Sequence, residues 1–158
     1  MAKQNNAPTI ENRQARHRFS LLETYEAGLV LSGCEVKSIR QGKASLSEAY
    51  GQIEGNEVWL EGMYVHPYEQ GGRMNPKEPA GRRKLLLHSG EIRKLKVAVG
   101  EKGLTLVPVK LYFNSRGFAK ITIAVARGKK LFDRRNEIVK RDQEKSLRRV
   151  GSHRHETD

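Results

Sequence analysis

Alternating hydrophobic and polar residues predict a mainly β fold for this chain. The segments 48–54 and 57–65 alternate in this way and flank Gly55-Asn56, which is typical of the two-residue turn of a β-hairpin. In the second segment, Val58, Leu60 and Tyr64 are predicted to share one face. The middle of the chain is therefore expected to be a hairpin.

Further strands are predicted on either side of this hairpin. Apolar and β-branched residues in 19–31 indicate one or two strands, and the apolar run in 84–88 indicates a short buried strand. Residues 66–82 hold three of the five prolines of the chain together with several glycines. This composition predicts a long flexible loop, which is a candidate binding element on a small β domain.

Two short helices are predicted between the strands. Residues 33–43 have the pattern of a helix that ends at Gly42. A second helix is predicted to begin after His88, because Glu91 follows three residues later, as in a capping box.

The last predicted hairpin joins residues 104–113 to residues 118–126. In its first strand, Val107 and Leu111 are predicted to share a face that Leu106 does not, and this change beside Pro108 indicates a β-bulge. In its second strand, Lys120 and Thr122 lie on a face predicted to be polar. Short strands, a bulge and small helices favour a partly open antiparallel barrel of the oligonucleotide-binding type.

The chain is predicted to have one core and two mobile ends. Residues 1–12 are polar and aperiodic, which indicates a flexible arm. Residues 13–127 are assigned to the barrel, and residues 128–158 to a basic tail that is disordered, or helical when bound.

Charge indicates the class of partner. The 158 residues include 30 Lys and Arg against 18 Asp and Glu, which gives a formal net charge of +12 and a pI near 10.0. Such a surface attracts polyanions, with RNA or DNA as the leading candidates and an excess of solubilising lysine as the alternative. No apolar run approaches the roughly 18 residues that a membrane span requires, so no membrane partner is expected.

Cysteine and histidine usage indicates no cofactor or metal. Cys34 is the only cysteine, which excludes an internal disulfide and a cysteine-based zinc cluster and fits a reducing cytoplasm. The histidines at 153 and 155 have no third ligand at a suitable spacing and are assigned to the tail.

The segment after the last strand is basic and lacks an apolar face. Residues 127–158 contain 11 Lys and Arg and 6 Asp and Glu. Glu137 with Arg141 and Glu144 with Arg148 are i, i+4 pairs that support a helix by only about 0.2–0.5 kcal/mol each. A helix in free solution is therefore expected to be marginal, and an ordinary solvated charge run is the alternative.

Several long strings resemble one bacterial family. They are ARH (15–17), ETYEAGLVLSGCEVKSIRQGKASL (23–46), RRKLLLH (82–88), KGLTLVPVKLYF (102–113) and ARGKKLFDRR (126–135). In this order they resemble the SsrA-binding protein (small protein B) family of bacterial trans-translation. The resemblance runs from about residue 12 to residue 147 and implies an oligonucleotide-binding-type barrel with a tail that is disordered until it reaches the ribosome.

The resemblance also implies a function. Members of the family bind the transfer-RNA-like domain of transfer-messenger RNA and deliver its charged form, with elongation factor Tu, to stalled ribosomes. The tail is then expected to lie in the vacant messenger channel and to fold as a helix against small-subunit ribosomal RNA. The partners implied are this RNA, the ribosome and, through the charged RNA, elongation factor Tu.

The same resemblance implies RNA-binding residues in the barrel. Glu26 corresponds to a family residue required for RNA binding, and Leu86 and His88 align with RNA-binding positions. The structural alternatives are that Glu26 is only a charge at a strand edge, that Leu86 is a core residue and that His88 is a helix cap. Further candidates for phosphate contacts, with a solvated face as the alternative, are Lys37, Arg40, Lys43 and Lys84.

Residues near the two ends are nominated for the ribosome. His17 is expected to stack on a base of the decoding centre. Gly128 is expected to be the flexible junction to the tail. The basic run and the triplet needed for tag translation are Lys129, Lys130, Asp133, Arg134 and Arg135.

A binding module is favoured over an enzyme. A small ribonuclease is the alternative from another class, with His17, His66 or His88 acting beside a carboxylate. These three histidines share no motif and fall on different predicted elements. A general ribosome-associated RNA-binding factor of the same barrel type is the other alternative.

Overall fold

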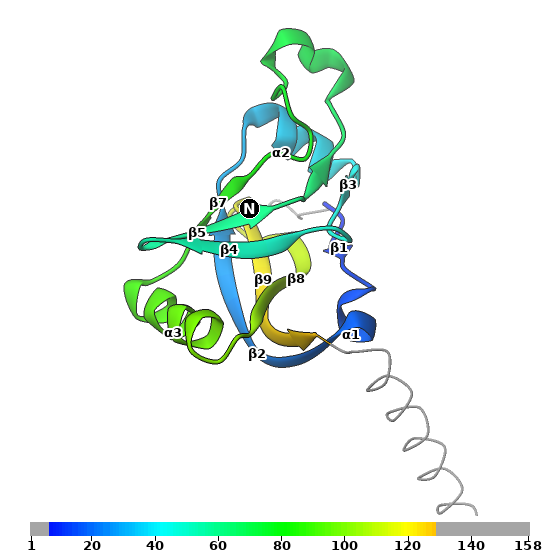
Figure 1. Cartoon of the computed structure of the whole chain (residues 1–158). Helices are drawn as coiled ribbons and strands as arrows, with labels where there is room; N and C mark the ends of the chain where they lie inside the picture. Colours follow the sequence, from blue (N-terminus) through cyan, green and yellow to red (C-terminus); the bar gives the residue numbers. More distant parts are fainter. Residues whose placement is uncertain (1–6, 129–158) are drawn as a thin grey trace, which may run out of the picture. The chain divides into compact units, whose positions relative to one another are not determined.

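The computed structural model describes residues 7–128, which form a mainly β structure with short helices between the strands (Figure 1). The strands are β1 (Ile10–Glu11), β2 (Phe19–Leu29), β3 (Ala44–Ser45), β4 (Tyr50–Glu54), β5 (Glu57–Glu61), β6 (Tyr64–Val65), β7 (Arg83–Leu86), β8 (Thr105–Phe113) and β9 (Ala119–Gly128). The helices are α1 (Ala15–Arg18), α2 (Gly33–Arg40), the 3-10 helix η1 (Glu69–Met74) and α3 (Ser89–Gly100). Among the helices of residues 7–128, none has the length and apolar character needed to traverse a membrane.

Six antiparallel strands form a ring. Their order is β8-β4-β5-β7-β2-β9, and β8 also pairs with β9, so the hydrogen-bonded pairing returns to its starting strand. The strands curve around one another in Figure 1, with α2 and α3 at opposite ends of the ring. The prediction of an antiparallel, mainly β structure with small helices is confirmed. The opening expected from the sequence is reduced to a narrow seam between β4 and β8, where Gly51 and Leu106 are the one registered pair.

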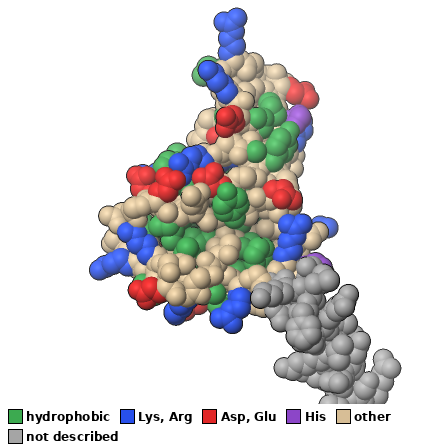
Figure 2. Space-filling model, in the orientation of Figure 1, with side chains coloured by type: hydrophobic (Ala, Val, Ile, Leu, Met, Phe, Trp, Pro, Cys, Tyr) green, Lys and Arg blue, Asp and Glu red, His purple; other side chains and the backbone are tan. Residues whose placement is uncertain are grey.

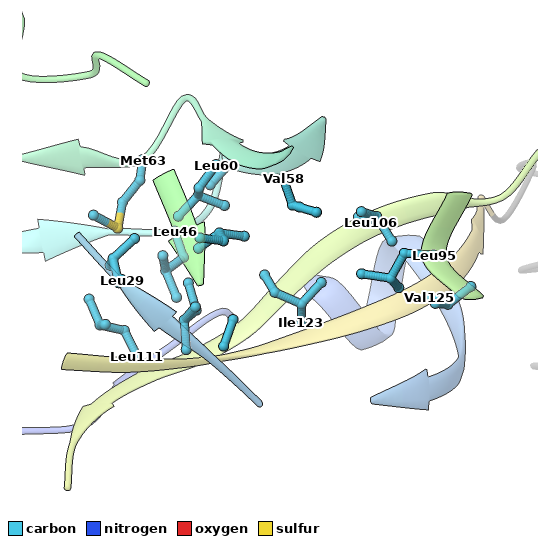
Figure 3. Close-up of a cluster of buried hydrophobic side chains, with 14 of the residues drawn as sticks. Leu29, Leu46, Val58, Leu60, Met63, Leu95, Leu106, Leu111, Ile123 and Val125 are labelled. Atoms are coloured by element: carbon cyan, nitrogen blue, oxygen red, sulfur yellow. The ribbon is translucent and has the colours of Figure 1, made fainter. Parts of the chain in front are cut away.

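The hydrophobic core fills the inside of this ring. Figure 3 shows side chains from β2, β5, β8, β9 and α3 pointing into one cluster. Its fully buried members include Ile39, Leu46, Leu60, Leu95, Leu106, Leu111, Ile121 and Ile123. Burying one such side chain contributes about 1.5–3 kcal/mol, so the cluster is the main source of stability for the ring.

Closure at the seam depends on the absence of a side chain at Gly51. A Cβ atom built there would lie 2.6 Å from the Cβ of Leu106, an atom that cannot move without its backbone. We expect Gly51→Ala to lower the free energy of unfolding by about 1–3 kcal/mol, as overpacking does. Urea denaturation would measure this, with Gly100→Ala as the control, because a Cβ atom at Gly100 meets nothing within 4 Å. Equal losses in both variants would contradict the close approach.

The predicted bulge in β8 lies at Val109. Pro108 pairs with Ile123 and Lys110 pairs with Thr122, so Val109 is the extra residue. The bulge brings Leu111 onto the same inner face as Leu106. Val107 instead packs with Ala15 and Ala126 in a second small cluster under α1. The bulge is therefore confirmed, but the expectation that Val107 and Leu111 share a face is wrong.

The outer face of β9 is polar only along part of its length. Lys120 and Thr122 are half-buried and polar as expected, whereas Ala124 and Ala126 are fully buried. The strand also continues beyond residue 126, because Gly128 pairs with Phe19. The residue expected to be the flexible junction is thus the last residue of a strand.

The strand predicted over 57–65 is interrupted at Gly62. This glycine has a φ of +75°, and a Cβ atom there would lie 2.6 Å from the carbonyl oxygen of Glu48. After the interruption, Met63 is fully buried and Tyr64 is exposed. The prediction that Tyr64 continues the buried face of Leu60 is therefore wrong.

The end of the expected N-terminal arm belongs to the fold. Ile10 pairs with Leu111, so β1 forms an edge strand on β8. Asn12 is buried, its backbone N–H donates to the Val109 carbonyl (2.8 Å), and its side-chain amide donates to the Pro108 carbonyl (2.9 Å). The expectation of a flexible arm through residue 12 is thus wrong for residues 10–12, because the bulge offers two free carbonyl groups.

Residues 66–82 are more ordered than the predicted flexible loop. The Asn75 side chain accepts a hydrogen bond from the Tyr68 N–H and donates one to the Tyr68 carbonyl, both at 2.8 Å, which closes the segment around η1. The guanidinium of Arg83 donates to the carbonyl groups of Pro79 and Gly81, both at 2.9 Å. The Arg83 contacts hold the end of the segment against β7.

Candidate nucleic-acid interface

Three residues predicted to bind RNA lie around one groove on the outer face of the ring. The groove has a volume of about 290 Å³ and is lined by Glu26, Gly28, Leu86, Leu87, His88, Glu91 and Lys120. Its floor crosses three neighbouring strands, because Gly28 of β2 pairs with Leu86 of β7 on one side and with Lys120 of β9 on the other. Residues far apart in the sequence thus meet at one place.

Leu86 supplies the apolar part of the groove. The side chain of Leu86 is 55 % exposed, whereas Leu85 is buried, as expected for neighbours on opposite faces of a strand. A Cβ atom at Gly28 would lie 3.2 Å from the Leu86 Cβ, so the glycine lets this leucine lie across the sheet. The alternative of a core leucine is excluded, and an exposed leucine beside charged groups is a surface on which a nucleobase can pack.

Glu26 supplies a hydrogen-bond acceptor beside Leu86. Its carboxylate is exposed, and its Oε1 atom lies 3.9 Å from the Lys120 Nζ. The pKa of Tyr112 is raised to about 12, chiefly by burial and next by interaction with the Glu26 carboxylate. The Glu26 carboxylate therefore lies beside a cation and is exposed to solvent.

His88 lies where β7 leads into α3. It occupies the N-cap position, and its backbone N–H donates to the Glu91 carboxylate (3.2 Å). The predicted helix start is confirmed. His88 is exposed and lines the groove, so capping by its backbone leaves the imidazole available to a ligand.

Lys84 lies on the same outer face, two residues before Leu86. Its Nζ atom is 3.2 Å from the Glu57 carboxylate on β5. Lys84 is outside the groove lining, but it extends the cationic character of this face beyond Leu86.

The other nominated cations lie around α2 and away from the groove. The Lys37 Nζ lies 5.3 Å from the ring centroid of Tyr68, and the Lys43 Nζ is 4.0 Å from the Glu69 carboxylate. The Arg40 guanidinium lies 4.7 Å from the ring centroid of Phe113 and donates to the Gly117 carbonyl (3.5 Å). The helix carrying Lys37 and Arg40 begins with a capping box made by Ser32 and Glu35 and ends at Arg40, within the region where a helix was predicted.

His17 lies in α1, exposed between two arginines. Ala15 anchors this helix against Ala126 near the end of β9. The other residues nominated for the ribosome, Lys129, Lys130, Asp133, Arg134 and Arg135, lie outside the described residues.

Charged side chains of both signs lie on the face of the molecule that Figure 2 shows. Figure 2 shows Lys and Arg side chains around the outline of the ring in this view, with acidic side chains between them.

The three histidines of the described residues lie on different elements: His17 is in α1, His66 follows β6 and His88 precedes α3. Within residues 7–128, no group of three His, Cys, Asp or Glu side chains is placed to hold a metal ion.

Lys120 lines the groove but was assigned from the sequence only to a polar strand face. The register of β9 against β2 places Lys120 opposite Gly28. An outward lysine on the predicted polar strand was the available signal for Lys120.

Comparison with known proteins gives consistent matches. The SmpB protein family matches residues 9–153. The SsrA-binding protein of Desulforudis audaxviator is 50 % identical over 150 residues, covering 95 % of this chain and 97 % of that protein. The SsrA-binding protein of Thermus thermophilus is 49 % identical over 144 residues, covering 91 % and 96 %. A solved structure described as "tmRNA-SmpB: a journey to the center of the bacterial ribosome" superposes with a TM-score of 0.67 at 52 % identity, covering 79 % of this chain and 87 % of the other.

Proposed function

The chain belongs to the SmpB protein family, and on that basis we propose that it binds transfer-messenger RNA and delivers it to stalled ribosomes for trans-translation. The observation that carries the proposal at the residue level is the groove on β2, β7 and β9. It brings Glu26, Leu86 and His88 together from two segments about 60 residues apart in the sequence.

Each side chain of the groove has a role that its chemistry supports. Leu86 provides an apolar surface for an unstacked base, and His88 provides a ring edge with a donor and an acceptor. Glu26 accepts hydrogen bonds from base amino groups or ribose hydroxyls, which adds specificity. Lys120 and Lys84 neutralise phosphates, which adds affinity. The cations Lys37, Arg40 and Lys43 extend the phosphate contacts around α2.

The two ends of the chain serve the ribosome in this proposal. His17 stacks on a base of the decoding centre, and residues 129–158 occupy the vacant messenger channel as a helix against ribosomal RNA. Elongation factor Tu acts through the charged RNA, and the protein works in the cytoplasm as a binding protein and not as an enzyme. The separation of the three histidines onto different elements supports this view over a ribonuclease.

Substitution of Glu26 tests the groove directly. We expect Glu26→Gln to weaken binding to transfer-messenger RNA about tenfold, because the amide is a weaker acceptor for RNA donors. Loss of a negative charge from a cationic protein strengthens non-specific phosphate binding, so weaker binding identifies the carboxylate as a specific contact. Fluorescence titration at several salt concentrations measures both the specific and the electrostatic contribution to RNA affinity.

The controls separate specific from electrostatic binding. Glu23→Gln removes an equivalent charge from β2 outside the groove, where the carboxylate accepts from the Tyr25 hydroxyl (2.9 Å), and is expected to bind as tightly as the unaltered protein. The affinity of the unaltered protein should fall steeply as salt rises. A flat salt response, or equal affinities of the two glutamine variants, would argue against this interface.

A further inference from the structure

Phe118 is an exposed aromatic residue close to the groove. It directly precedes β9, and its side chain is 62 % exposed. Lys120, two residues further along, lines the groove, whereas Ile121 is fully buried. Because side chains alternate between the two faces of a strand, Phe118 and Lys120 both point to the outer face. Two residues of a strand span about 7 Å, so the phenyl ring lies just beyond the end of the groove.

Val30 adds apolar surface at the same end of the groove. Its N–H donates to the Lys84 carbonyl (3.1 Å), so it continues the pairing of β2 with β7, and its side chain is 49 % exposed. Since β2 and β9 are antiparallel, the direction from Gly28 to Val30 is also the direction from Lys120 to Phe118. Exposed apolar side chains therefore extend the surface that begins in the groove, and such a patch on a charged surface marks an interaction site.

A closed turn fixes the backbone of Phe118. The Asn114 Oδ1 accepts hydrogen bonds from the N–H groups of Arg116 (3.0 Å) and Phe118 (2.9 Å), and the Asn114 N–H donates to the Phe118 carbonyl (2.9 Å). Gly117, with a φ of +83°, allows the chain to turn within this short distance. An aromatic ring on a fixed backbone has only two side-chain torsions to order, so a planar ligand can stack on it at little cost in conformational entropy.

Cations lie on both sides of Phe118. Lys120 is on the side of the groove, and the Arg40 guanidinium of α2 donates to the carbonyl of Gly117 (3.5 Å). The turn between β8 and β9 thus connects the groove with the cations around α2. Proteins that hold single-stranded nucleic acid combine aromatic rings, on which bases stack, with cations that follow the phosphates. Phe118, Lys120 and Arg40 have this combination.

We propose that Phe118 is a base-stacking residue: an unstacked nucleobase of transfer-messenger RNA packs on its ring, and the neighbouring phosphates contact Lys120 and Arg40. The RNA then runs from the groove over the turn between β8 and β9 to α2. This inference rests on the proposed function and adds to it a second base subsite beside that of Leu86.

Substitution of Phe118 in the full chain tests the proposal. Phe118→Ala is expected to weaken binding to transfer-messenger RNA about tenfold with an unchanged salt slope, because the ring contacts a base and no phosphate. Phe118→Tyr keeps the aromatic face and should bind as tightly as the unaltered protein. Phe118→Leu keeps only an apolar side chain and should recover little of the loss. Tyr50→Ala is the matched control: it removes another exposed aromatic ring, on β4 across the ring of strands from the groove, and should leave affinity unchanged.

Fluorine NMR reports directly whether RNA reaches the ring. In protein labelled with 4-fluorophenylalanine, the Phe118→Leu variant identifies the Phe118 signal among those of the four phenylalanines. Addition of transfer-messenger RNA should move the Phe118 signal, whereas the signal of Phe19, at the other end of β2, should stay in place. The spectrum without RNA shows whether each variant is folded.

The outcomes separate this inference from the function on which it rests. If Glu26→Gln weakens binding but Phe118→Ala binds as tightly as Tyr50→Ala, the stacking role is overturned and the proposed function stands. Full affinity of Phe118→Leu, or a Phe118 signal that RNA does not move, overturns the stacking role in the same way. If Glu26→Gln, Leu86→Ala and Phe118→Ala all bind as tightly as the unaltered protein, the proposed recognition face is overturned, and the role of Phe118 falls with it.

Discussion

A protein that ends at Gly128 should bind transfer-messenger RNA with nearly unchanged affinity and should fail to support tagging of stalled peptides. The ring is complete at this residue, because Gly128 is the last residue of β9 and pairs with Phe19. The groove lies wholly within β2, β7, β9 and the start of α3. Truncation removes ten Lys and Arg and six Asp and Glu, which lowers the formal charge from +12 to +8 and leaves the body cationic.

Two assays on the same preparation check this expectation. Fluorescence titration reports RNA affinity, and a reconstituted translation reaction on messenger RNA without a stop codon reports addition of the tag. Full-length protein with Arg134→Lys is the control, since the change keeps the charge and should keep tagging. A large loss of RNA affinity on truncation would show that the tail belongs to the RNA-binding unit.

Arg83→Met should lower the free energy of unfolding by about 3–5 kcal/mol, as loss of one partner from a buried ion pair does. The Arg83 side chain is 5 % exposed, its Nε atom pairs with the buried Glu35 carboxylate, and it donates to three backbone carbonyl groups in the segment 63–81. Methionine fills a similar volume but removes the cation that neutralises Glu35 and the N–H groups that Arg83 donates to the three carbonyl groups. Chemical denaturation followed by circular dichroism measures the loss.

Two further variants show whether the buried charge is the cause. Arg82→Met alters the neighbouring arginine, whose exposed guanidinium pairs with Glu54 at 2.9 Å and Glu61 at 3.2 Å, and should cost much less stability. Adding Glu35→Gln to Arg83→Met should recover part of the loss, because the uncompensated charge is removed and the amide still accepts from the Ser32 N–H. If Arg83→Met and Arg82→Met lowered the free energy of unfolding equally, burial of the Arg83–Glu35 ion pair would not explain the loss.

Local patterns predicted most of the secondary structure. The Gly55-Asn56 turn, the α2 and α3 starts and the bulge near Pro108 each depend on residues within one or two turns of chain, so the sequence carries their signal directly. Here the chemistry of a few neighbouring residues determines the outcome.

Features that depend on distant contacts were not predictable in the same way. The interruption at Gly62 results from the carbonyl of Glu48, and the strand at Ile10–Glu11 results from pairing with β8. The burial of Ala126 results from α1 packing over β9. Each requires a partner that hydrophobic periodicity does not identify.

The candidate site shows the same division. The resemblance nominated Glu26, Leu86 and His88, and the strand register brings them into one groove. Lys120 joins them only through the pairing of β9 with β2. Pairing between strands distant in the sequence is a tertiary property, and so the place of Lys120 in the site was visible only in the structure.

The seam between β4 and β8 is the place where the ring is expected to open first. A single registered pair joins these strands, whereas β2 and β9 are aligned over almost their whole length. Transient openings begin where the fewest hydrogen bonds must break. In the order of the ring, that weakest joint lies across from the three strands that carry the groove. The groove itself crosses the β2–β7 joint, which has two registered pairs, and the β2–β9 joint, which has nine, so its β9 side is held more firmly than its β7 side.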